Sequence, residues 1–291
     1  MSITVIIGTL NEEKNLEACL RSCISFDQIY VVDSHSTDQT CQIAESIGAT
    51  VVQYDYDGGW PKKRNWALRN LPIRNKWVLI LDADERVGPE LQEEIHRAIA
   101  SANAATVGFY IRWRFIFLGR WMKHCWRHGW MLRLFRHGKV EYEDLGLRGE
   151  GGWDAEVHEN LVPLEGNTKK LRNWLEHDTN EDLSFWIRKQ NEFSTWNAVR
   201  RTQQLAERMP SLASLFGRDL QAKRKWLKAL FIRLPMRSTV VFLWLYFIKL
   251  GMLDGKEGFY FCRLRAIHEL NISAKIFELK RTKNETSSSE H

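Results

Sequence analysis

The segment Val78–Glu85, VLILDADE, decides the fold because it joins an unbroken apolar run to a group of acids. A short apolar run is typical of a strand buried on both faces, as in a parallel sheet. The acids that follow then lie at the carboxyl end of the strand, where open α/β sheets bind their ligands. Two carboxylates spaced as in Asp82-Ala83-Asp84 can bridge a divalent cation to a diphosphate. An acidic turn that caps the next helix is the alternative interpretation of this motif taken alone.

Strand and helix patterns alternate through the first third of the chain. Short apolar runs predict strands at Ile3–Ile7, Gln28–Val32, Thr50–Gln53 and Trp77–Leu81. Helical spacing predicts a helix through Leu16, Leu20 and Cys23, and further helices at Gln42–Ile47, Lys62–Leu71 and Pro89–Ala100. This alternation implies βαβ units and an open parallel sheet. The predicted strand ends are polar and mostly acidic, at Thr9–Glu12, Asp33–Asp38 and Asp82–Glu85.

The pattern changes in the second part of the chain. Val107–Arg114 and Met131–Phe135 are typical of strands in a mixed extension of the sheet, and Asp182–Met209 and residues 220–234 of helices. We therefore expect a catalytic domain over residues 1–180, with halves 1–105 and 106–180. A helical region over 181–279 and a disordered, Ser-rich tail over 280–291 would follow.

Composition excludes several classes of protein. The 291 residues are 44% hydrophobic and 27% charged, with 42 Lys+Arg against 36 Asp+Glu and hence a net charge of 42 − 36 = +6. These values exclude disorder, collagen and coiled coil as the main architecture. The five cysteines form no C-x-x-C pair, so neither a disulfide scaffold nor a zinc framework is expected, and the cysteines indicate a reducing compartment.

The charges are arranged in blocks. Residues 112–139 hold eight Lys/Arg and no acid, residues 140–165 hold eight acids against Arg148, and residues 218–237 hold seven Lys/Arg against Asp219. Blocks of this kind are either solvated faces or surfaces for partners of opposite charge. Four tryptophans lie among the arginines of the first block, a pattern that also suits nucleic acid.

Four motifs occur in one order: Val5–Leu16 (VIIGTLNEEKNL), Val31–Thr40 (VVDSHSTDQT), Lys63–Leu68 (KRNWAL) and Leu79–Glu85 (LILDADE). In these the sequence resembles the family 2 glycosyltransferases of the GT-A fold. It is most similar to the bacterial branch of lipopolysaccharide core and exopolysaccharide biosynthesis. Arg133-Leu-Phe-Arg, Val157-His-Glu and Leu253–Phe259 (LDGKEGF) extend the resemblance over most of the chain. One departure is Gly8-Thr9-Leu10, where the family usually has Pro-Thr and an aromatic residue.

The resemblance implies a Rossmann-like mixed sheet flanked by helices, and it implies the residues of the site. Asp33 would accept a hydrogen bond from a uracil base, and Lys63 or Arg64 would offset the charge of a diphosphate. Asp84, with Asp82 and His177, would hold Mg²⁺ or Mn²⁺. The full set expected to bind the nucleotide sugar is Thr9, Leu10, Asn11, Glu12, Asp33, Ser34, Lys63, Arg64, Asn65, Asp82 and Ala83. Taken alone, Lys63 and Arg64 would be a solvated helix start, and His177 a structural histidine.

An inverting transferase needs a general base that deprotonates the acceptor hydroxyl. Asp154, Glu156 and Glu159 are the candidates in the acidic block. Glu159 is favoured because Val157-His158-Glu159 matches the position of the family's base, and Glu156 is the second choice. The alternative is that these residues are part of a solvated acidic surface.

The predicted function is transfer of a sugar from a nucleotide sugar, most plausibly a UDP-sugar, to a glycan or lipid-linked glycan, with no nucleic-acid partner. The block 112–139 would meet the acceptor or pack as a subdomain rimmed by arginines. Residues 218–253 would lie on the inner face of the cell membrane, peripherally and facing the cytoplasm, or would cap the catalytic domain. A nucleotidyltransferase is one alternative, although the acidic Gly8–Glu13 lacks a Gly-rich, Lys-containing phosphate loop. A basic nucleic-acid-binding or scaffold protein is the other, although Asp33, Asp82 and Asp84 are intact.

Overall fold

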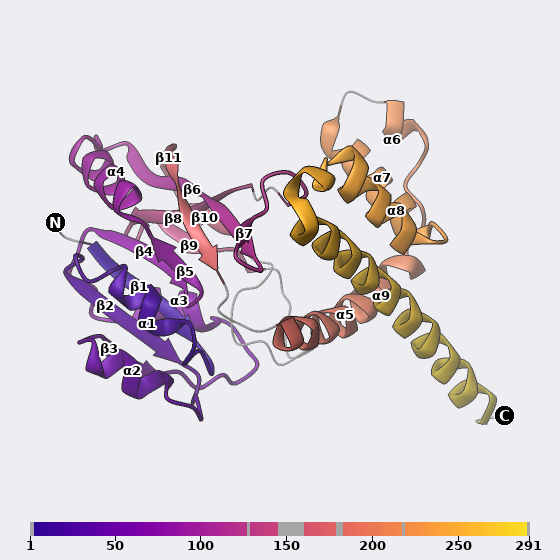
Figure 1. Cartoon of the computed structure of the whole chain (residues 1–291), viewed down its shortest axis with the longest axis horizontal. Coiled ribbons are helices and arrows are strands. Elements are labelled where there is room, and N and C mark those ends of the chain that lie inside the picture. The colour runs from indigo at the N-terminus through magenta and orange to yellow at the C-terminus, as the bar shows by residue number, and fades with distance from the viewer. Residues whose placement is uncertain (1–2, 127–128, 145–159, 179–182, 217–218, 290–291) are drawn as a thin grey trace. The chain divides into compact units, whose positions relative to one another are not determined.

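The computed structural model describes residues 3–126, 129–144, 160–178, 183–216 and 219–289 (Figure 1). The chain forms two compact units. The first comprises Met1–Trp121 and Arg127–Asn180, and we call it the sheet unit. The second comprises Met122–Trp126 and Glu181–His291, and we call it the helical unit. The five residues Met122–Trp126 thus belong to the helical unit, although the sequence analysis assigned them to the catalytic domain.

Nine strands of the described residues form one mixed sheet in the order β3-β2-β1-β4-β8-β6-β11-β5, with β7 paired to β6. The half β3-β2-β1-β4 is parallel, and β8 joins it antiparallel to both β4 and β6. The strands are β1 Ile3–Thr9, β2 Gln28–Asp33, β3 Thr50–Gln53, β4 Trp77–Asp82, β5 Glu85–Val87, β6 Thr106–Phe117, β7 Arg120–Trp121, β8 Trp130–Arg136 and β11 Asn167–Asp178. A second, two-stranded sheet pairs β9 Val140–Tyr142 with β10 Leu161–Pro163.

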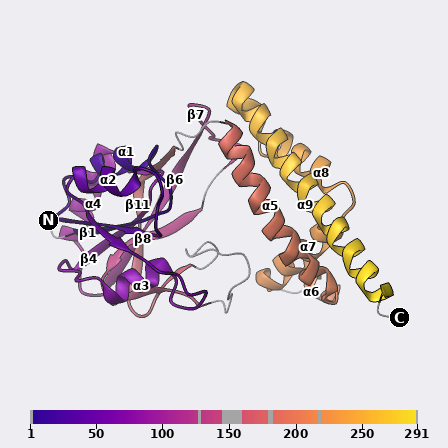
Figure 2. The same cartoon turned by 90° about the horizontal axis from the view of Figure 1, so that it is seen from below.

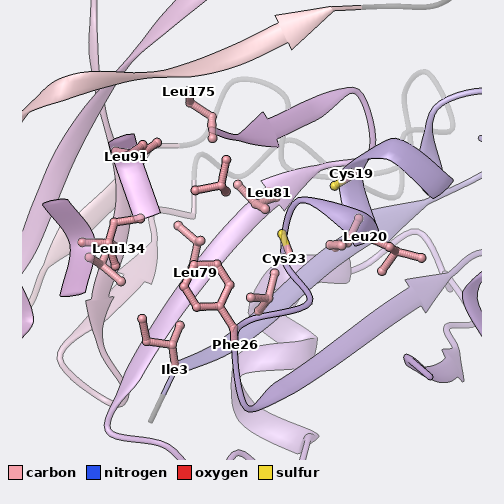
Figure 3. Packing of buried hydrophobic residues seen from close by; sticks show 14 of the residues in the cluster. Ile3, Cys19, Leu20, Cys23, Phe26, Leu79, Leu81, Leu91, Leu134 and Leu175 are labelled. Carbon is pink, nitrogen blue, oxygen red and sulfur yellow. The ribbon is translucent and has the colours of Figure 1, made fainter. Parts of the chain in front are cut away.

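Helices cover both faces of the parallel half, because alternate residues of its buried strands point to opposite sides. On one face of the sheet, Ile3, Leu79 and Leu81 pack against Leu20 of α1 and Leu91 of α4 (Figure 3). Ile6, Val32, Val78 and Ile80 face the other side and pack against Leu68 of α3. The helices are α1 Leu16–Arg21, α2 Thr40–Ser46, α3 Lys63–Asn70 and α4 Pro89–Ala100. A mixed sheet flanked by helices confirms the predicted fold class.

The strand β11 was not predicted from the sequence. It runs parallel to β6 and antiparallel to β5, and it brings His177 opposite Glu85. Only Leu171 and Leu175 of its twelve residues are buried, so the strand lacks the apolar run that marks the central strands. This strand matters for the site because it ends beside the acids that follow β4.

The helical unit consists of α5 Leu183–Ala206, α6 Ala213–Phe216, α7 Leu220–Arg233, α8 Arg237–Leu243, a π-helical turn η1 Trp244–Ile248, a 3₁₀ turn η2 Gly251–Asp254 and α9 Gly255–Ser289. Helices α5 and α9 lie side by side (Figure 2), with Ala198, Ile272 and Ile276 buried between them. Arg201 of α5 donates to both carboxylate oxygens of Glu269, at 2.6 and 2.9 Å.

Helix α9 continues to Ser289, where the sequence analysis predicted a disordered tail from Lys280. Lys, Arg and Glu are good helix formers, and an existing helix needs no new nucleus to extend. Polar composition alone therefore did not decide the structure of this segment.

Asp254, at the start of α9, fixes the segment Met122–Trp126. Its carboxylate accepts hydrogen bonds from the backbone N–H groups of Lys123 (3.1 Å) and Cys125 (2.9 Å) and contacts Nδ1 of His124 at 2.7 Å. Asp254 itself is buried. This acid therefore anchors a segment that lies about 130 residues away in the sequence.

Among the described residues, no single helix is long and apolar enough to cross a membrane. The pair Arg237–Ile248 and Gly251–Thr282 meets the criterion of length and composition only when the two are taken together, and they are bent by 73°. Leu250 has a positive φ of 58° at the bend. A Cβ on the next residue, Gly251, would lie 2.8 Å from Cys262 Sγ, so the bend packs closely onto α9.

Candidate active site

Strand register brings the predicted site residues to one edge of the sheet. Thr9 of β1 lies opposite Asp33 of β2, and Gly8 of β1 lies opposite Asp82 of β4. These strands are parallel, so all three carboxyl ends meet at the same edge. The loops that leave this edge carry Asn11, Glu12 and Asp84.

Asp33 is buried and its carboxylate joins the first two loops. Thr9 Oγ1 donates to Oδ1 at 2.8 Å, Ser36 Oγ donates to the same oxygen at 2.5 Å, and the Ser36 N–H donates to Oδ2 at 2.7 Å. Burial alone would raise the pKa of Asp33, but the hydrogen bonds from Ser36 and Thr9 outweigh burial and hold that pKa below its usual range. Asp33 is therefore an ionised carboxylate that fixes the shape of this edge.

Further bonds connect the loop after β1 to the loop after β2. The Asn11 N–H donates to Ser36 Oγ at 2.8 Å, and Asn11 Oδ1 accepts from the Thr37 N–H at 2.8 Å. The Glu12 N–H donates to Thr40 Oγ1 at 2.8 Å. Leu10 is 49% exposed beside these polar groups, and the Ser34 N–H donates to Thr9 O at 3.1 Å. These hydrogen bonds join the two loops to each other, and Leu10 is the exposed apolar side chain beside them.

Asp82 lies between two guanidinium groups. Arg64 of α3 pairs with its Oδ1, and Arg133 of β8 donates from Nη2 to its Oδ2 at 2.8 Å. The same Nη2 of Arg133 donates to Glu85 Oε1 at 2.7 Å, and Glu85 Oε2 accepts from the Asp82 N–H at 2.9 Å. Arg133 also stacks over Trp113 at 5.1 Å. Two acids and two bases thus form one network under the edge, in which Arg133 and Glu85 are buried and Asp82 and Arg64 are partly exposed.

Burial and charge act differently on the two acids of this network. Burial would raise the pKa of Asp82, but the charges of Arg133 and Arg64 outweigh burial and hold it well below its usual range. Burial raises the pKa of Glu85 well above its usual value, and the neighbouring charge of Asp82 raises it further. Asp82 is therefore ionised, and Arg133 is the cation that opposes the effect of burial on Glu85.

Asp84 and His177 come together beyond this network. His177 Nε2 lies 3.3 Å from Asp84 Oδ2, and the imidazole packs between Trp113 and Phe115 at ring distances of 5.2 and 5.6 Å. Asp84 Oδ1 and His177 Nδ1 are buried and have no hydrogen-bond partner within the described ranges. Ala83 between the two aspartates is buried. No group of three or more His, Cys, Asp or Glu in the described part of the chain could hold a metal ion.

Two residues of the predicted nucleotide set support the framework. Lys63 is buried, and its Nζ donates to the Thr9 carbonyl at 2.7 Å. Asn65 is also buried and exchanges two 2.9 Å hydrogen bonds with the backbone of Tyr142, so it connects α3 to β9. Of the Lys63–Asn65 run, Arg64 alone is only partly buried and reaches the acids after β4. Glu156 and Glu159, predicted as bases, lie outside the described residues.

The sequence analysis did not assign Arg133 and Glu85 to the site. The signal was present, because Arg133 interrupts the apolar run Met131–Phe135 and Glu85 directly follows Asp82-Ala83-Asp84. A charged residue within a buried strand needs a partner of opposite charge. The partners lie 48 and 51 residues apart in sequence, so the sequence did not identify them.

The tryptophans of the basic block stack with its arginines. Arg112 lies 4.6 Å from the ring of Trp130 and 3.8 Å from that of Trp174, and Arg114 lies 4.7 Å from that of Trp121. Such cation–π pairs hold both partners in place on the surface of β6 and its neighbours. Part of the high tryptophan content is explained by these pairs.

A comparison with protein families identifies the group to which this chain is related. The model of glycosyl transferase family 2 matches residues 4–152, which include Asp33, Asp82 and Asp84. The chain belongs to glycosyl transferase family 2.

Individual relatives extend this result. The lipopolysaccharide core biosynthesis glycosyltransferase LpsC of Rhizobium meliloti is 28% identical over 292 aligned residues, which cover 96% of this chain and 93% of the relative. An uncharacterised glycosyltransferase of Rickettsia bellii is 40% identical over 102 residues, so the match spans about a third of either protein (35% and 34%). The crystal structure of S. aureus TarS 1–349 in complex with UDP is 17% identical, with a TM-score of 0.45 and 90% of each chain covered.

Proposed function

We propose that this family 2 glycosyltransferase is an inverting, metal-dependent enzyme of lipopolysaccharide or other cell-surface polysaccharide assembly. It would move a sugar from a UDP-sugar to a hydroxyl of a glycan or lipid-linked glycan. The proposal is supported by the relation to LpsC along almost the whole chain. The observation that carries it is the set of acids at one sheet edge, with Asp33 after β2 and Asp82 and Asp84 after β4.

The first two loops would bind the nucleoside. Because Asp33 holds Thr9 and Ser36, it fixes the loop backbone and the side chain of Asn11. Leu10 would offer an apolar surface to the base at the place where the family usually has an aromatic residue. The ionised carboxylate of Asp33 would also attract the N3–H of uracil, which cytosine lacks. A preference for UDP over CDP would follow.

The paired arginines would offset the charge of the diphosphate. Arg64 is partly exposed, with 14% of its side chain accessible, whereas Arg133 is 2% exposed and fully engaged with Asp82 and Glu85. Arg64 is therefore the guanidinium group that can reach a phosphate oxygen, and Arg133 keeps Asp82 in place behind it. A bidentate contact from arginine would orient the leaving group.

Asp84 and His177 fit a divalent cation, because each presents a buried polar atom that lacks a protein partner within the described residues. Mg²⁺ is commonly held by one or two carboxylates and completed by phosphate oxygens, so Asp84 would be its main protein ligand, with His177 beside it. When bound, the cation would stabilise the negative charge of the departing diphosphate. Asp82 would act differently from the prediction, since both its oxygens already pair with arginine, and it would orient Arg64 rather than bind the metal.

Glu159 would be the general base, with Glu156 as the second choice. Its carboxylate would take the proton of the acceptor hydroxyl as that oxygen bonds to the anomeric carbon. The bond from this carbon to the phosphate oxygen would break, and UDP would leave. The Arg112–Trp130–Trp174 stack would support a sugar or phosphate of the acceptor.

The test is a panel of nucleotide sugars, each with Mg²⁺ or Mn²⁺, scored by thermal stabilisation and by release of the nucleoside diphosphate. We expect stabilisation by UDP-sugars and not by GDP-, CDP- or ADP-sugars. E159Q should keep the stabilisation and lose turnover by about 10²–10⁴-fold, the usual contribution of a general base. E165Q is the matched control, because Glu165 is an exposed acid of the same block. Stabilisation by another nucleotide class, or full activity of E159Q, would contradict the respective assignment.

A further inference from the structure

The helical unit exposes apolar side chains around the bend between α8 and α9. Trp244, Phe247 and Ile248 of η1 are 51%, 49% and 64% exposed. The neighbours Leu250, Met252 and Leu253 are 43–56% exposed. Large exposed apolar patches are uncommon on soluble monomers, and they mark interaction surfaces. We call these six residues the apolar tip.

The segment that leads to the apolar tip has one sign of charge. Residues 220–253 contain seven Lys/Arg and no acid. Arg237 turns inward to Ser273 Oγ at 2.8 Å, and Arg233 donates to backbone carbonyls, but Arg224, Lys225, Lys228 and Lys249 are exposed. The next acid, Asp254, is buried and holds the backbone of Lys123–Cys125. Lys249 lies between the residues of the tip in the sequence, and no acid of residues 220–253 opposes it. The tip therefore combines apolar side chains with an exposed basic one, a combination that complements an anionic lipid surface.

The bend limits how deeply the apolar tip can enter a bilayer. Ser238–Ile248 has eleven uncharged residues, whereas a spanning helix needs about 20. The chain then turns at Leu250 and Gly251, and a Cβ on Gly258 would lie 2.4 Å from Gly251 O, so the turn is tightly packed. Lys249 lies 5.8 Å from the ring of Trp244, a pairing suited to the level of the lipid headgroups. Shallow insertion of the tip satisfies these constraints, whereas a straight span does not.

We propose that the apolar tip inserts into the interfacial layer of an anionic membrane, with the ammonium group of Lys249 at the lipid headgroups. The occupant of this surface is the lipid itself. This proposal extends the predicted peripheral localisation to named side chains. It does not depend on the proposed sugar transfer, because its readout uses neither nucleotide nor acceptor.

The test is flotation of the full-length protein with vesicles of phosphatidylglycerol and phosphatidylcholine, and with phosphatidylcholine alone, at physiological salt. We expect flotation with the anionic vesicles only. F247E/I248E should lower the partition coefficient at least about tenfold, because it removes two apolar contacts and adds two negative charges. F247L/I248L should retain binding. L164E, which adds a charge at a residue of the sheet unit that is 59% exposed, is the control.

Circular dichroism and the thermal midpoint of each variant separate loss of binding from loss of folding. If F247E/I248E fails to fold, K249Q tests the same surface, because Lys249 lies 5.8 Å from the ring of Trp244, and it should weaken flotation several-fold. Absence of flotation by the wild type would overturn the proposal. So would equal binding to both vesicle types, or self-association of the wild type in sedimentation that F247E/I248E abolishes while flotation is unchanged.

Discussion

The sheet unit and the helical unit place charged and apolar groups in opposite ways. At the edge of the sheet unit, Arg133 and Glu85 are buried together and pair with the partly buried Asp82. In the helical unit the core between α5 and α9 is thin, and large apolar side chains such as Trp244 and Ile248 face outward. Each arrangement costs stability, through desolvation of charges in the first case and exposed apolar surface in the second. In each unit, the arrangement that costs stability lies where a ligand or a membrane surface is proposed to bind.

The largest effect should come from breaking the buried network of the sheet unit. R133M would leave the buried Glu85 without its cation and the partly buried Asp82 with Arg64 alone, and we expect the free energy of unfolding to fall by about 3–5 kcal/mol. Urea unfolding followed by near-ultraviolet circular dichroism measures this change. Stabilisation by UDP should also be lost.

Two further variants control this experiment. R69M removes an exposed ion pair with Glu141 and should cost less than about 1 kcal/mol. E85Q/R133M should be less destabilised than the sum of the single variants, because the neutral amide introduced by E85Q needs no cation. A cost below about 1 kcal/mol for R133M would show that the network does not hold this edge.

The helical unit has a buried histidine in α9, and pH should reveal it. Burial first, and then the charge of Arg265, lower the pKa of His268 from 6.5 to about 4, against the opposing effects of Gln190 O and Glu269. A lowered histidine pKa favours the neutral folded form, so its stabilisation is complete above pH 6.5 and is lost as the pH falls toward about 4. The loss should reach up to about 3 kcal/mol, since one pKa unit corresponds to about 1.4 kcal/mol.

Thermal unfolding between pH 7 and 4 measures this loss. H268Q should flatten the slope between pH 6.5 and 4.5. Equal slopes for H268Q and the wild type would exclude His268 as the cause.

A smaller effect is expected from G258A at the bend. The added methyl group would meet the Gly251 carbonyl, which is backbone and cannot move aside without shifting the turn. Overpacking of this kind costs about 1–3 kcal/mol. The thermal midpoint should fall, and vesicle flotation should weaken because the apolar tip would be displaced. G129A, where a Cβ has no neighbour within 4 Å, is the control and should change neither measurement.

Local sequence was sufficient for the central strands and helices. Ile3–Ile7 and Val78–Leu81 are apolar almost without interruption, and such runs have few alternatives to a buried strand. The family resemblance placed Asp84 and His177 together, and the structure has them 3.3 Å apart. The engagement of Lys63 with Thr9 O was not predicted, because it depends on how α3 packs under β1.

Contacts between distant segments explain the remaining differences. Asp82 was predicted as a metal ligand; its pairing with Arg133, which comes from a strand 51 residues away in the sequence, was not predicted. β11 escaped prediction because only two of its twelve residues are buried, and α9 extends through a segment whose polarity indicated disorder. In each case a partner that is remote in sequence, or a helix already begun, determined the outcome.

The path of the segment Met122–Trp126 affects how the chain could be shortened to one of its two units. Because the chain leaves the sheet unit after Trp121, joins the helical unit for five residues and returns at Arg127, the two units are connected by three chain crossings rather than one. A protein that ends near residue 180 would keep these five residues without the Asp254 carboxylate that binds them, and would uncover Met122 and Cys125, which are otherwise buried. No single cut in the chain therefore separates the helical unit from the sheet unit.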